Sequence, residues 1–299
     1  MPELVNLGSL CIDHVYAVPS IVRAGETLLG HDPVRHAGGK GLNQSLAAAR
    51  AGAAVVHVGC VGADGVWLKD VLGQAGVDVD GVRVCHSDPT GHAVIQVTPH
   101  GENAIVIVGG ANRRIQPSDV ERAIARVGND GWLLLQNEIN DIEHVIAAAR
   151  RASVRLALNI APVDGREANY ALDGVELLLL NEIEAAALTR DTDPKRAIER
   201  LARERPRQHV VVTLGVHGVL YACGDERITL PAFEVTAVDE TAAGDAFIGH
   251  LMAAWIENLP MRERLRRASA AGALAVCVPG AAPAIPNAAS VQQFLADYR

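Results

Sequence analysis

The sequence predicts an α/β fold with a mostly parallel central sheet, helices on its faces and a small antiparallel β lid. Along most of the 299 residues, short apolar runs bounded by Gly, Asp and Pro alternate with alanine-rich helical stretches. This alternation is typical of parallel strands joined by helical crossovers. In two regions the apolar residues instead recur at every second position and no helix intervenes, which is typical of antiparallel strands.

The core elements follow one another without a linker or an internal repeat, so we expect one large sheet rather than two independent domains. The predicted core strands are 4–7, 54–58, 132–135, 156–158, 177–180 and 210–213. The predicted helices are 43–51, 67–74, 117–126, 142–151, 182–188 and 194–203, followed by two later helices that begin after Asp245 and after Arg262.

The lid is predicted from residues 11–38 and 89–111, which leaves residues 1–10, 39–88 and 112–299 as the α/β core. Two excursions that leave a parallel core and pair with each other form a small sheet over the carboxyl ends of the core strands, where open α/β sheets bind ligands. Apolar neighbours such as Val94 and Ile95 point to opposite faces of this thin sheet. We therefore expect a second copy of the chain to cover one face, as a homodimer.

The composition argues against several classes of partner. With 27 Lys+Arg against 35 Asp+Glu, the formal charge is −8, which disfavours nucleic acid and anionic membranes. Aromatic residues make up only 3%, and three prolines break the uncharged stretch 268–287, so neither a base-stacking surface nor a membrane helix is expected. The five cysteines form no CxxC pair and no charged-then-apolar signal region opens the chain. We expect a cytoplasmic protein without nucleic-acid or membrane partners.

The segment Gly38-Gly39-Lys40-Gly41-Leu42-Asn43-Gln44 stands directly before an alanine-rich helix. Its glycines allow the backbone to approach a small ligand closely, and Lys40 and Asn43 offer donors at the mouth of the helix. A tight strand-to-helix turn explains the same residues. No Ser or Thr follows Lys40, so this is not a Walker A loop, and the spacing GxxGxxG at 59–65 is not the dinucleotide fingerprint GxGxxG.

A second motif, Asp239-Glu240-Thr241-Ala242-Ala243-Gly244-Asp245, precedes a helix with apolar periodicity. The small residues before the helix let free backbone amides point toward one spot, which suits an anion that carries developing charge. A carboxylate at the same spot can accept the proton of a hydroxyl that attacks phosphorus. An ordinary capping aspartate is the alternative interpretation of Asp245.

Two weaker motifs suggest a nucleotide site. The strand 210–213 runs into a glycine-containing turn, which can bring backbone and the hydroxyl of Thr213 beside phosphates or a base. Asn181, Glu182 and Glu184 follow the strand 177–180, so an amide and two carboxylates lie at a strand's carboxyl end, where Mg²⁺ could be held through water. Helix-capping residues would have the same pattern.

Taken in order, the segments GSLCID, GGKGLNQ, QNE, NIAP, NEIEA, TLGVHG and DETAAGD resemble the PfkB/ribokinase family of carbohydrate kinases, and the ribokinases within it most closely. The resemblance spans nearly the whole chain. It implies a ribokinase-like three-layer sandwich and a lid that often pairs with a second subunit. It also implies that the chain uses ATP and Mg²⁺ to phosphorylate the primary hydroxyl of a pentose, with the conversion of D-ribose to D-ribose 5-phosphate as the expected reaction.

The resemblance also implies roles for individual residues. Asp245 matches the catalytic base, and the anion hole matches Ala242, Ala243 and Gly244. The expected sugar contacts are Asp13, Gly39, Lys40, Asn43 and Glu138. The expected nucleotide contacts are Asn181, Glu184, Thr213, Gly215 and Gly218. The expected monovalent-cation loop, which would bind K⁺, comprises Asp239, Thr241, Ala275, Val278, Gly280 and Ala284.

This sequence departs from the ribokinase pattern at two positions. Cys11 stands where ribokinases usually carry Asn, two residues before Asp13, and a thiol is a poor hydrogen-bond partner. A kinase for a nucleoside or another furanose therefore remains the alternative within the enzyme class. Ala284 replaces a common serine, so we expect K⁺ activation to be weakened. A non-catalytic sugar- or nucleotide-binding regulator is the alternative outside that class, and the intact Gly244 and Asp245 argue against it.

Overall fold

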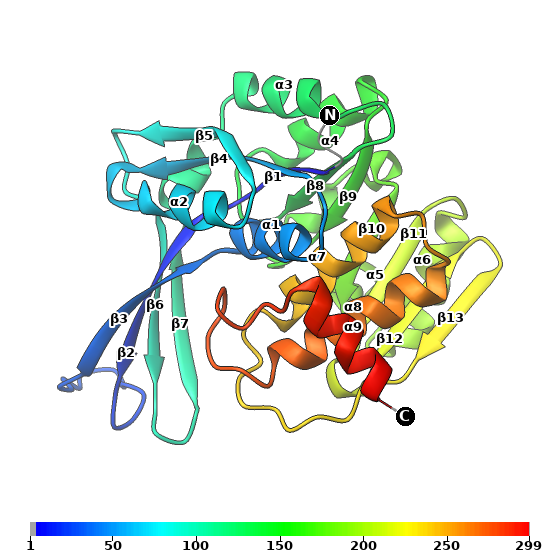
Figure 1. Cartoon of the computed structure of the whole chain (residues 1–299). Helices are drawn as coiled ribbons and strands as arrows, with labels where there is room; N and C mark the ends of the chain where they lie inside the picture. The colour runs from blue at the N-terminus through cyan, green and yellow to red at the C-terminus, as the bar shows by residue number, and fades with distance from the viewer. Residues whose placement is uncertain (1–3, 299) are drawn as a thin grey trace.

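The computed structural model describes residues 4–298, which form two sheets with helices around the larger one (Figure 1). The larger sheet has nine strands in the order β13-β12-β11-β10-β9-β8-β1-β4-β5. All neighbours from β11 to β5 pair in parallel, and the hairpin of β12 and β13 adds two antiparallel strands at one edge. In chain order the strands are β1 (Leu4–Leu7), β4 (Val55–Gly62), β5 (Asp78–Cys85), β8 (Trp132–Gln136), β9 (Arg155–Asn159), β10 (Leu177–Asn181), β11 (His209–Thr213), β12 (Val219–Cys223) and β13 (Glu226–Leu230).

Helices cover both faces of this sheet, because successive residues of each central strand point to opposite sides. In β1, Leu4 joins one apolar core and Val5 joins the other. The core that contains Leu4 is closed by α1 (Lys40–Arg50), α2 (Trp67–Gln74), α7 (Ala243–Ile256), α8 (Met261–Ala275) and α9 (Ala288–Asp297). The core that contains Val5 is closed by α3 (Pro117–Arg126), α4 (Ile142–Arg151), α5 (Glu182–Thr189) and α6 (Pro194–Glu204).

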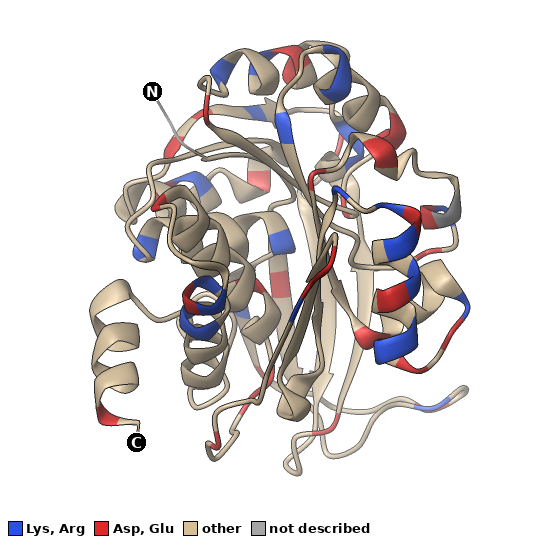
Figure 2. Ribbon diagram, turned by 90° about the vertical axis from the view of Figure 1, so that its right-hand side faces the viewer, with Lys and Arg blue, Asp and Glu red and all other residues tan. Residues whose placement is uncertain are grey.

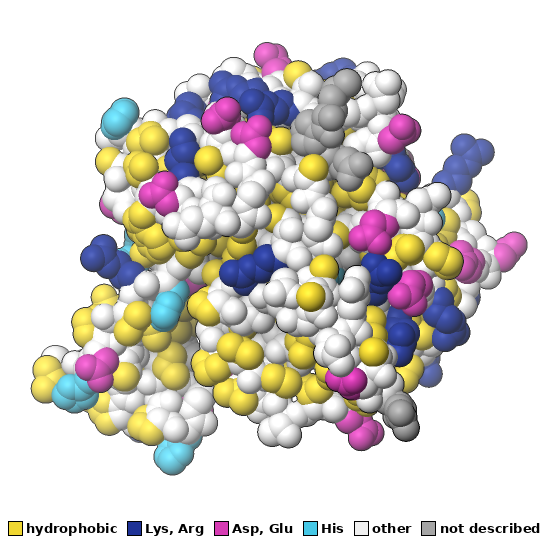
Figure 3. Space-filling model, in the orientation of Figure 1, with side chains coloured by type: hydrophobic (Ala, Val, Ile, Leu, Met, Phe, Trp, Pro, Cys, Tyr) yellow, Lys and Arg dark blue, Asp and Glu magenta, His cyan; other side chains and the backbone are white. Residues whose placement is uncertain are grey.

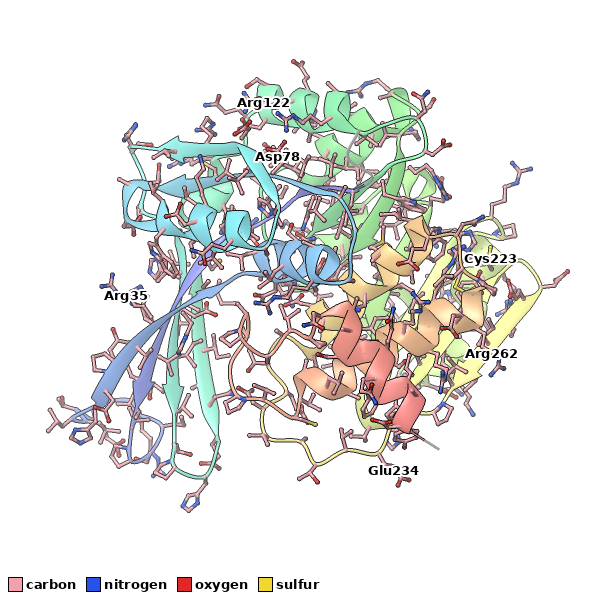
Figure 4. All side chains as sticks on the ribbon, viewed as in Figure 1. Arg35, Asp78, Arg122, Cys223, Glu234 and Arg262 are labelled. Atoms are coloured by element: carbon pink, nitrogen blue, oxygen red, sulfur yellow. The ribbon has the colours of Figure 1, made fainter. Side chains whose placement is uncertain are left out.

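Charged residues lie mainly on the helices and connecting loops, while most of the sheet carries none (Figure 2). None of the helices within residues 4–298 combines the length and the apolar character needed to cross a bilayer. Cys223 at the end of β12 and Arg262 at the start of α8 lie on the opposite side of the molecule from Arg35 (Figure 4).

The smaller sheet, which contains Arg35, projects from the body in the order β3-β2-β6-β7 (Figure 1). Its strands are β2 (Cys11–Ala17), β3 (His31–Gly38), β6 (Gly91–Val97) and β7 (Asn103–Val108). They form two antiparallel hairpins, and the two hairpins join through a parallel pairing of β2 with β6. All four strands fall within the two segments in which the sequence predicted them.

The predicted core strands and helices are confirmed, except that α7 and α8 begin at Ala243 and Met261, ahead of the predicted starts after Asp245 and Arg262. The structure adds three strands and one α-helix that the sequence analysis missed. Strand β5 reads Asp-Val-Asp-Gly-Val-Arg-Val-Cys and lies at an edge of the sheet, where polar residues interrupt the apolar signal. The hairpin of β12 and β13 turns at Gly224, whose φ is +54°. Helix α9 is alanine-rich and starts with the Asn287 side chain accepting from the Ser290 amide. Helix α1 also begins at Lys40, three residues before the predicted start.

One contact places the two helices that matter most for function side by side. A Cβ on Gly249 of α7 would overlap the backbone and side chain of Ala47 in α1, so the two helix backbones pack in direct contact. We expect Gly249→Ala to force these helices apart and to lower the free energy of unfolding by about 1–3 kcal/mol, measured by urea denaturation. Gly73→Ala in α2 is the matched control, because the added Cβ meets no atom within 4 Å. It should keep or raise stability by up to about 1 kcal/mol, and equal losses in both variants would contradict this account.

Candidate active site

The carboxylate of Asp245 lies where the first turns of α1 and α7 meet. Its Oδ1 accepts a hydrogen bond from Gln44 Nε2 at 2.8 Å, and its Oδ2 accepts one from Asn43 Nδ2 at 3.0 Å. Only 7% of Asp245 is exposed. The carboxylate is thus an acceptor on both oxygens, and the two amides fix its orientation before any ligand arrives.

The start of α7 offers backbone donors next to this carboxylate. Ala242 has a left-handed backbone with φ +60°, which ends the preceding loop abruptly. The amide of Ala243 donates to the Glu240 carbonyl at 3.3 Å and that of Ala246 to the Ala242 carbonyl at 2.8 Å. Within residues 4–298, the amides of Gly244 and Asp245 have no backbone acceptor. Such free amides at a helix N-terminus suit an anion.

A cavity opens in front of these donors. Gly244 faces it, because a Cβ built there would have no atom within 4 Å. The cavity extends from the start of α7 to the carboxyl ends of β10 and β11 and is lined mainly by Lys40, Asn159, Ala161, Leu179, Leu180, Asn181, Glu184, Val211, Thr213, Glu240, Ala242, Gly244, Asp245, Phe247 and Ile248. The structure therefore brings the predicted catalytic residues and part of the predicted nucleotide set to one cavity.

A second group of predicted residues surrounds Asp13 on β2. A Cβ on Gly38 would overlap the Asp13 carboxylate, so this glycine allows the side chain to lie against the backbone of β3. Glu138 Oε2 accepts from the Lys40 amide at 2.9 Å and from the Ser9 hydroxyl. These contacts tie the end of β8 to the start of α1.

The charges of this group act on one another. Burial, Glu138 and Asp245 raise the pKa of Asp13 to about 7, so this carboxyl is only half ionised near neutrality. Burial also raises the pKa of Asp245, although Lys40 and the amides of Gln44 and Asn43 oppose the shift. Burial lowers the pKa of Lys40, but the carboxylates of Asp245, Glu138 and others nearby outweigh it and raise that pKa overall.

The remaining predicted sugar contacts lie in the same region. Gly39 has φ +92°, and a Cβ on it would come within 3.0 Å of the Cys11 amide and 3.2 Å of its Sγ. Asn43 is 5% exposed and its Oδ1 has no hydrogen-bond partner in the described part of the chain. A buried acceptor without a partner is costly, and a ligand hydroxyl could satisfy it.

The predicted nucleotide residues divide into two kinds. Asn181 and Glu184 cap α5 reciprocally, with amide-to-side-chain distances of 2.8 Å in both directions, so the capping interpretation describes their present contacts. Thr213 donates to the Leu180 carbonyl at 3.3 Å. Gly215 and Gly218 both have positive φ, but Gly215 faces open space whereas a Cβ on Gly218 would overlap the Leu230 carbonyl. Gly218 therefore has a structural role, because it lets the turn between β11 and β12 pack against the end of β13.

The predicted cation-loop residues also lie together. Asp239 accepts from the Thr241 amide and hydroxyl at 2.9 and 2.6 Å, and from the Gly280 amide at 2.8 Å. The Val238 and Asp239 amides both donate to the Val276 carbonyl. Ala275 and Val278 lie in this turn, with a 3.2 Å bond from the Val278 amide to the Ala275 carbonyl, and the buried Ala284 closes it. Nowhere in residues 4–298 do three His, Cys, Asp or Glu side chains gather as metal ligands, so backbone carbonyls would supply most ligands here.

Several residues that shape the site escaped the sequence analysis. Gln44 and Ser9 contact predicted site residues directly, and Asn112 binds the backbone of Leu10 through both ends of its amide, at 3.0 Å each. Gln136 and Asn159 stand within the segments QNE and NIAP, but no partner for either residue could be predicted. Polar residues inside buried strands are the signal that could have identified them, because such groups require hydrogen-bond partners.

Comparison with known proteins gives consistent results across sequence and structure. The pattern of the pfkB family carbohydrate kinase matches residues 1–288. A ribokinase of Haemophilus influenzae is 34% identical over 300 residues, which cover 98% of each chain. The structure of Arabidopsis thaliana ribokinase complexed with ribose and ATP is 32% identical with a TM-score of 0.85 and covers 98% of each chain. Ribokinase from Cryptococcus neoformans var. grubii in complex with ADP is 29% identical with a TM-score of 0.87, and the match covers 98% of this chain and 99% of that one.

Proposed function

The chain belongs to the pfkB family of carbohydrate kinases, and we propose that it transfers the γ-phosphoryl group of ATP to the primary hydroxyl of D-ribose, forming D-ribose 5-phosphate and ADP. The observation that carries this proposal is the carboxylate of Asp245 beside the free amides at the start of α7. The carboxylate is the base that an attacking alcohol requires, and the amides are hydrogen-bond donors for the phosphoryl group.

In the proposed reaction, the sugar oxygen attacks the γ-phosphorus while the bond from that phosphorus to the leaving oxygen of ADP breaks. Asp245 accepts the hydroxyl proton as the new O–P bond forms. The amides of Gly244 and Asp245 donate to the phosphoryl oxygens, and Ala242 and Ala243 set the turn that aims them. Because there is little covalent chemistry for the protein to perform, positioning and charge stabilisation supply most of the rate.

Acceptors and donors from β2 of the smaller sheet, from the start of α1 and from the segment after β8 would hold the sugar. Asp13, Glu138 and the unpartnered Oδ1 of Asn43 are acceptors for hydroxyl hydrogens, and a vicinal pair of hydroxyls can bind one carboxylate. Lys40 and the backbone of Gly39 supply donors on the other side. A site built on buried polar groups rejects analogues that lack the matching hydroxyls, because these groups would then lose their partners.

The nucleotide would occupy the part of the cavity at the ends of β10 and β11, beside Asn181, Thr213 and the turn that contains Gly215 and Gly218. The oxygen donors of Asn181 and Glu184 suit Mg²⁺ held through water. Mg²⁺ that accompanies the phosphates supplies charge neutralisation when bound. The carbonyl-rich turn at Asp239, Thr241, Ala275, Val278, Gly280 and Ala284 suits K⁺, which has no need of anionic side chains.

The smaller sheet would act as a lid, made of residues 11–38 and 89–111, and as the surface that joins two copies of the chain. Both faces of β7 are apolar and open, with Ile105, Val106 and Ile107 exposed by 51%, 63% and 57%, and hydrophobic side chains spread over the projecting sheet in Figure 3. A second copy of the same sheet is a partner of matching character. Only monomer in sedimentation at micromolar concentration would remove the dimer. We also propose a cytoplasmic location, because ATP is available there and a reducing compartment keeps the five cysteines free.

We expect Asp245→Asn to lower kcat by about 10²–10⁴-fold, because it removes the base. The change should leave the fold nearly intact, since Asn43 can turn its amide over and accept from the new NH₂ group through Oδ1, which has no hydrogen-bond partner within residues 4–298. Its own NH₂ group can then donate to the oxygen of the sugar hydroxyl, so the KM values should change little. Steady-state kinetics of ADP release, with thermal unfolding as the stability control, provide the measurement. Near-normal kcat in a folded variant would rule out the proposed base.

The raised pKa of Asp13, about 7, predicts a pH dependence of sugar binding. The ionised carboxylate accepts hydroxyl hydrogens, so it is the binding form, and its population falls as the pH drops through 7. At saturating MgATP, the KM for the sugar should rise about tenfold from pH 8 to pH 6. Asp13→Asn should bind the sugar more weakly and show no such dependence. A KM for the wild-type chain that stays constant over this range would contradict the assignment.

A nucleoside or another furanose is the second candidate substrate, favoured by Cys11. Its thiol lies on the same face of β2 as Asp13 and accepts from Asn112 Nδ2 at 3.3 Å, so it offers a sugar hydroxyl only a weak partner. We expect D-ribose to give the highest kcat/KM in a panel of pentoses, ketohexoses and nucleosides. A nucleoside with the highest value would replace ribose as the substrate and leave the kinase chemistry unchanged. No turnover of ATP with any member would favour the non-catalytic regulator.

A further inference from the structure

A chain of three buried amide side chains runs from the central sheet to Asp245. Gln44 Nε2, which donates to Asp245, belongs to an amide whose Oε1 accepts from Gln136 Nε2 at 2.7 Å. Gln136 Nε2 also donates to Asn6 Oδ1 at 3.0 Å. Asn6 and Gln44 are 0% exposed and Gln136 is 1% exposed. The three residues come from β1, β8 and α1, so their alignment depends on the tertiary fold.

The direction of this chain is determined at its far end. Asn6 Nδ2 donates to the Gly41 carbonyl and to Ser45 Oγ, both at 2.8 Å. A carbonyl can only accept, so the Asn6 amide cannot turn over, and its Oδ1 must face Gln136. Gln136 therefore presents its NH₂ group to both Asn6 and Gln44. Gln44 in turn directs its oxygen toward Gln136 and its NH₂ group toward Asp245.

A side branch imposes the same direction. Asn159 Nδ2 donates to the Leu179 carbonyl at 3.2 Å, and its Oδ1 accepts from Gln44 Nε2 at 3.1 Å. Turning Gln44 over would bring its oxygen against the oxygens of Asn159 and Asp245. Two independent carbonyls, of Gly41 and Leu179, thus hold the Gln44 NH₂ group on Asp245. Asn43, which binds the other carboxylate oxygen, has no such support, because its Oδ1 has no hydrogen-bond partner among residues 4–298.

We propose that Asn6, Gln136 and Gln44 act as positioning residues that present a fixed donor to Asp245 and so keep this carboxylate ionised and ready to accept a proton. If Asp245 were protonated, its hydroxyl hydrogen would point at the NH₂ group of Gln44 or Asn43, or Gln44 would donate to a neutral carboxyl oxygen, which is a weaker acceptor. Gln44 cannot turn over to relieve this, because the carbonyls of Gly41 and Leu179 fix the orientation of the amide network. The inference rests on the proposed function, because it concerns the base of that reaction.

The charged groups around Asp245 act alongside this chain. Lys40 of α1 favours the ionised form, whereas Glu138 beyond β8, Asp13 of β2 and Glu184 of α5 oppose it. Burial also favours the protonated form. Among the groups that favour the ionised form, the charge of Lys40 acts most strongly and the Gln44 donor follows it. Without this donor, Asp245 would lose a stabilising contact in a buried region that carries three other carboxyl groups.

Gln136→Met tests the proposal, because Gln136 touches neither Asp245 nor the proposed ligand cavity. The variant removes the NH₂ group that binds Gln44 Oε1, so that only Asn159 still orients Gln44. It keeps an unbranched side chain of similar length. The measurement is the single-turnover rate of phosphoryl transfer at saturating D-ribose and MgATP, from pH 5 to pH 9. We expect the acid limb of this profile to move to higher pH by about one unit, with the KM for ribose at pH 8.5 changed by less than about threefold.

Gln208→Met is the matched control. Gln208 is 5% exposed and donates to the Leu172 and Val175 carbonyls at 3.0 and 2.8 Å. It directly precedes β11 and so lies at the opposite end of this strand from the cavity. It should lose comparable stability in thermal unfolding while its pH profile overlays that of the wild-type chain. If Gln136→Met does not fold, Asn6→Ser, which removes the amide that orients Gln136, should move the same limb in the same direction.

The outcomes separate this inference from the proposed function. An unmoved acid limb in a folded Gln136→Met, or an equal shift in Gln208→Met, overturns the positioning chain. An active Asp245→Asn overturns the base itself. A chain without ATP-dependent turnover of ribose overturns the proposed function instead, before either variant is compared.

Discussion

The direct backbone contact between α1 and α7 is the constraint on which the site depends. Gly249 and Ala47 bring the two helices side by side, and one turn earlier on each helix Asp245 meets Asn43 and Gln44. The N-terminal ends of both helices therefore lie at the same edge of the large sheet. The start of α7 provides free amides, and the start of α1 provides residues that we propose bind the sugar. Under that proposal, a single packing contact sets the geometry between the two substrates.

The local parts of this structure could be predicted from the sequence, because local patterns encode them. Apolar runs gave the parallel strands, and the small residues before Asp245 indicated free amides at the start of α7. The start of α1 was placed three residues late, because Gly39 and Gly41 disfavour helix, whereas tertiary contacts with Ser9 and Glu138 hold that first turn. Edge strands such as β5 were missed because their polar residues have no apolar period.

The interactions that organise the site could not be predicted in the same way. Asn6 and Gln136 are 130 residues apart in sequence and bond within the core. A single sequence shows that each is a polar residue in an apolar run. Which residue becomes its hydrogen-bond partner depends on the strand order, which makes β1 and β8 neighbours. Such networks are specific to the fold because every amide in them has only a few possible partners.

Asp13 belongs to a strand of the small sheet, while Asp245 and Glu138 belong to the body of the molecule. Under the proposed function the sugar contacts both parts, so its affinity depends on how the two sheets stand relative to each other. Any subunit that binds the exposed faces of β7 in one arrangement of the sheets must, by thermodynamic linkage, favour or disfavour sugar binding by the same free energy with which the sugar favours or disfavours association. Apparent affinity in such a molecule varies with protein concentration.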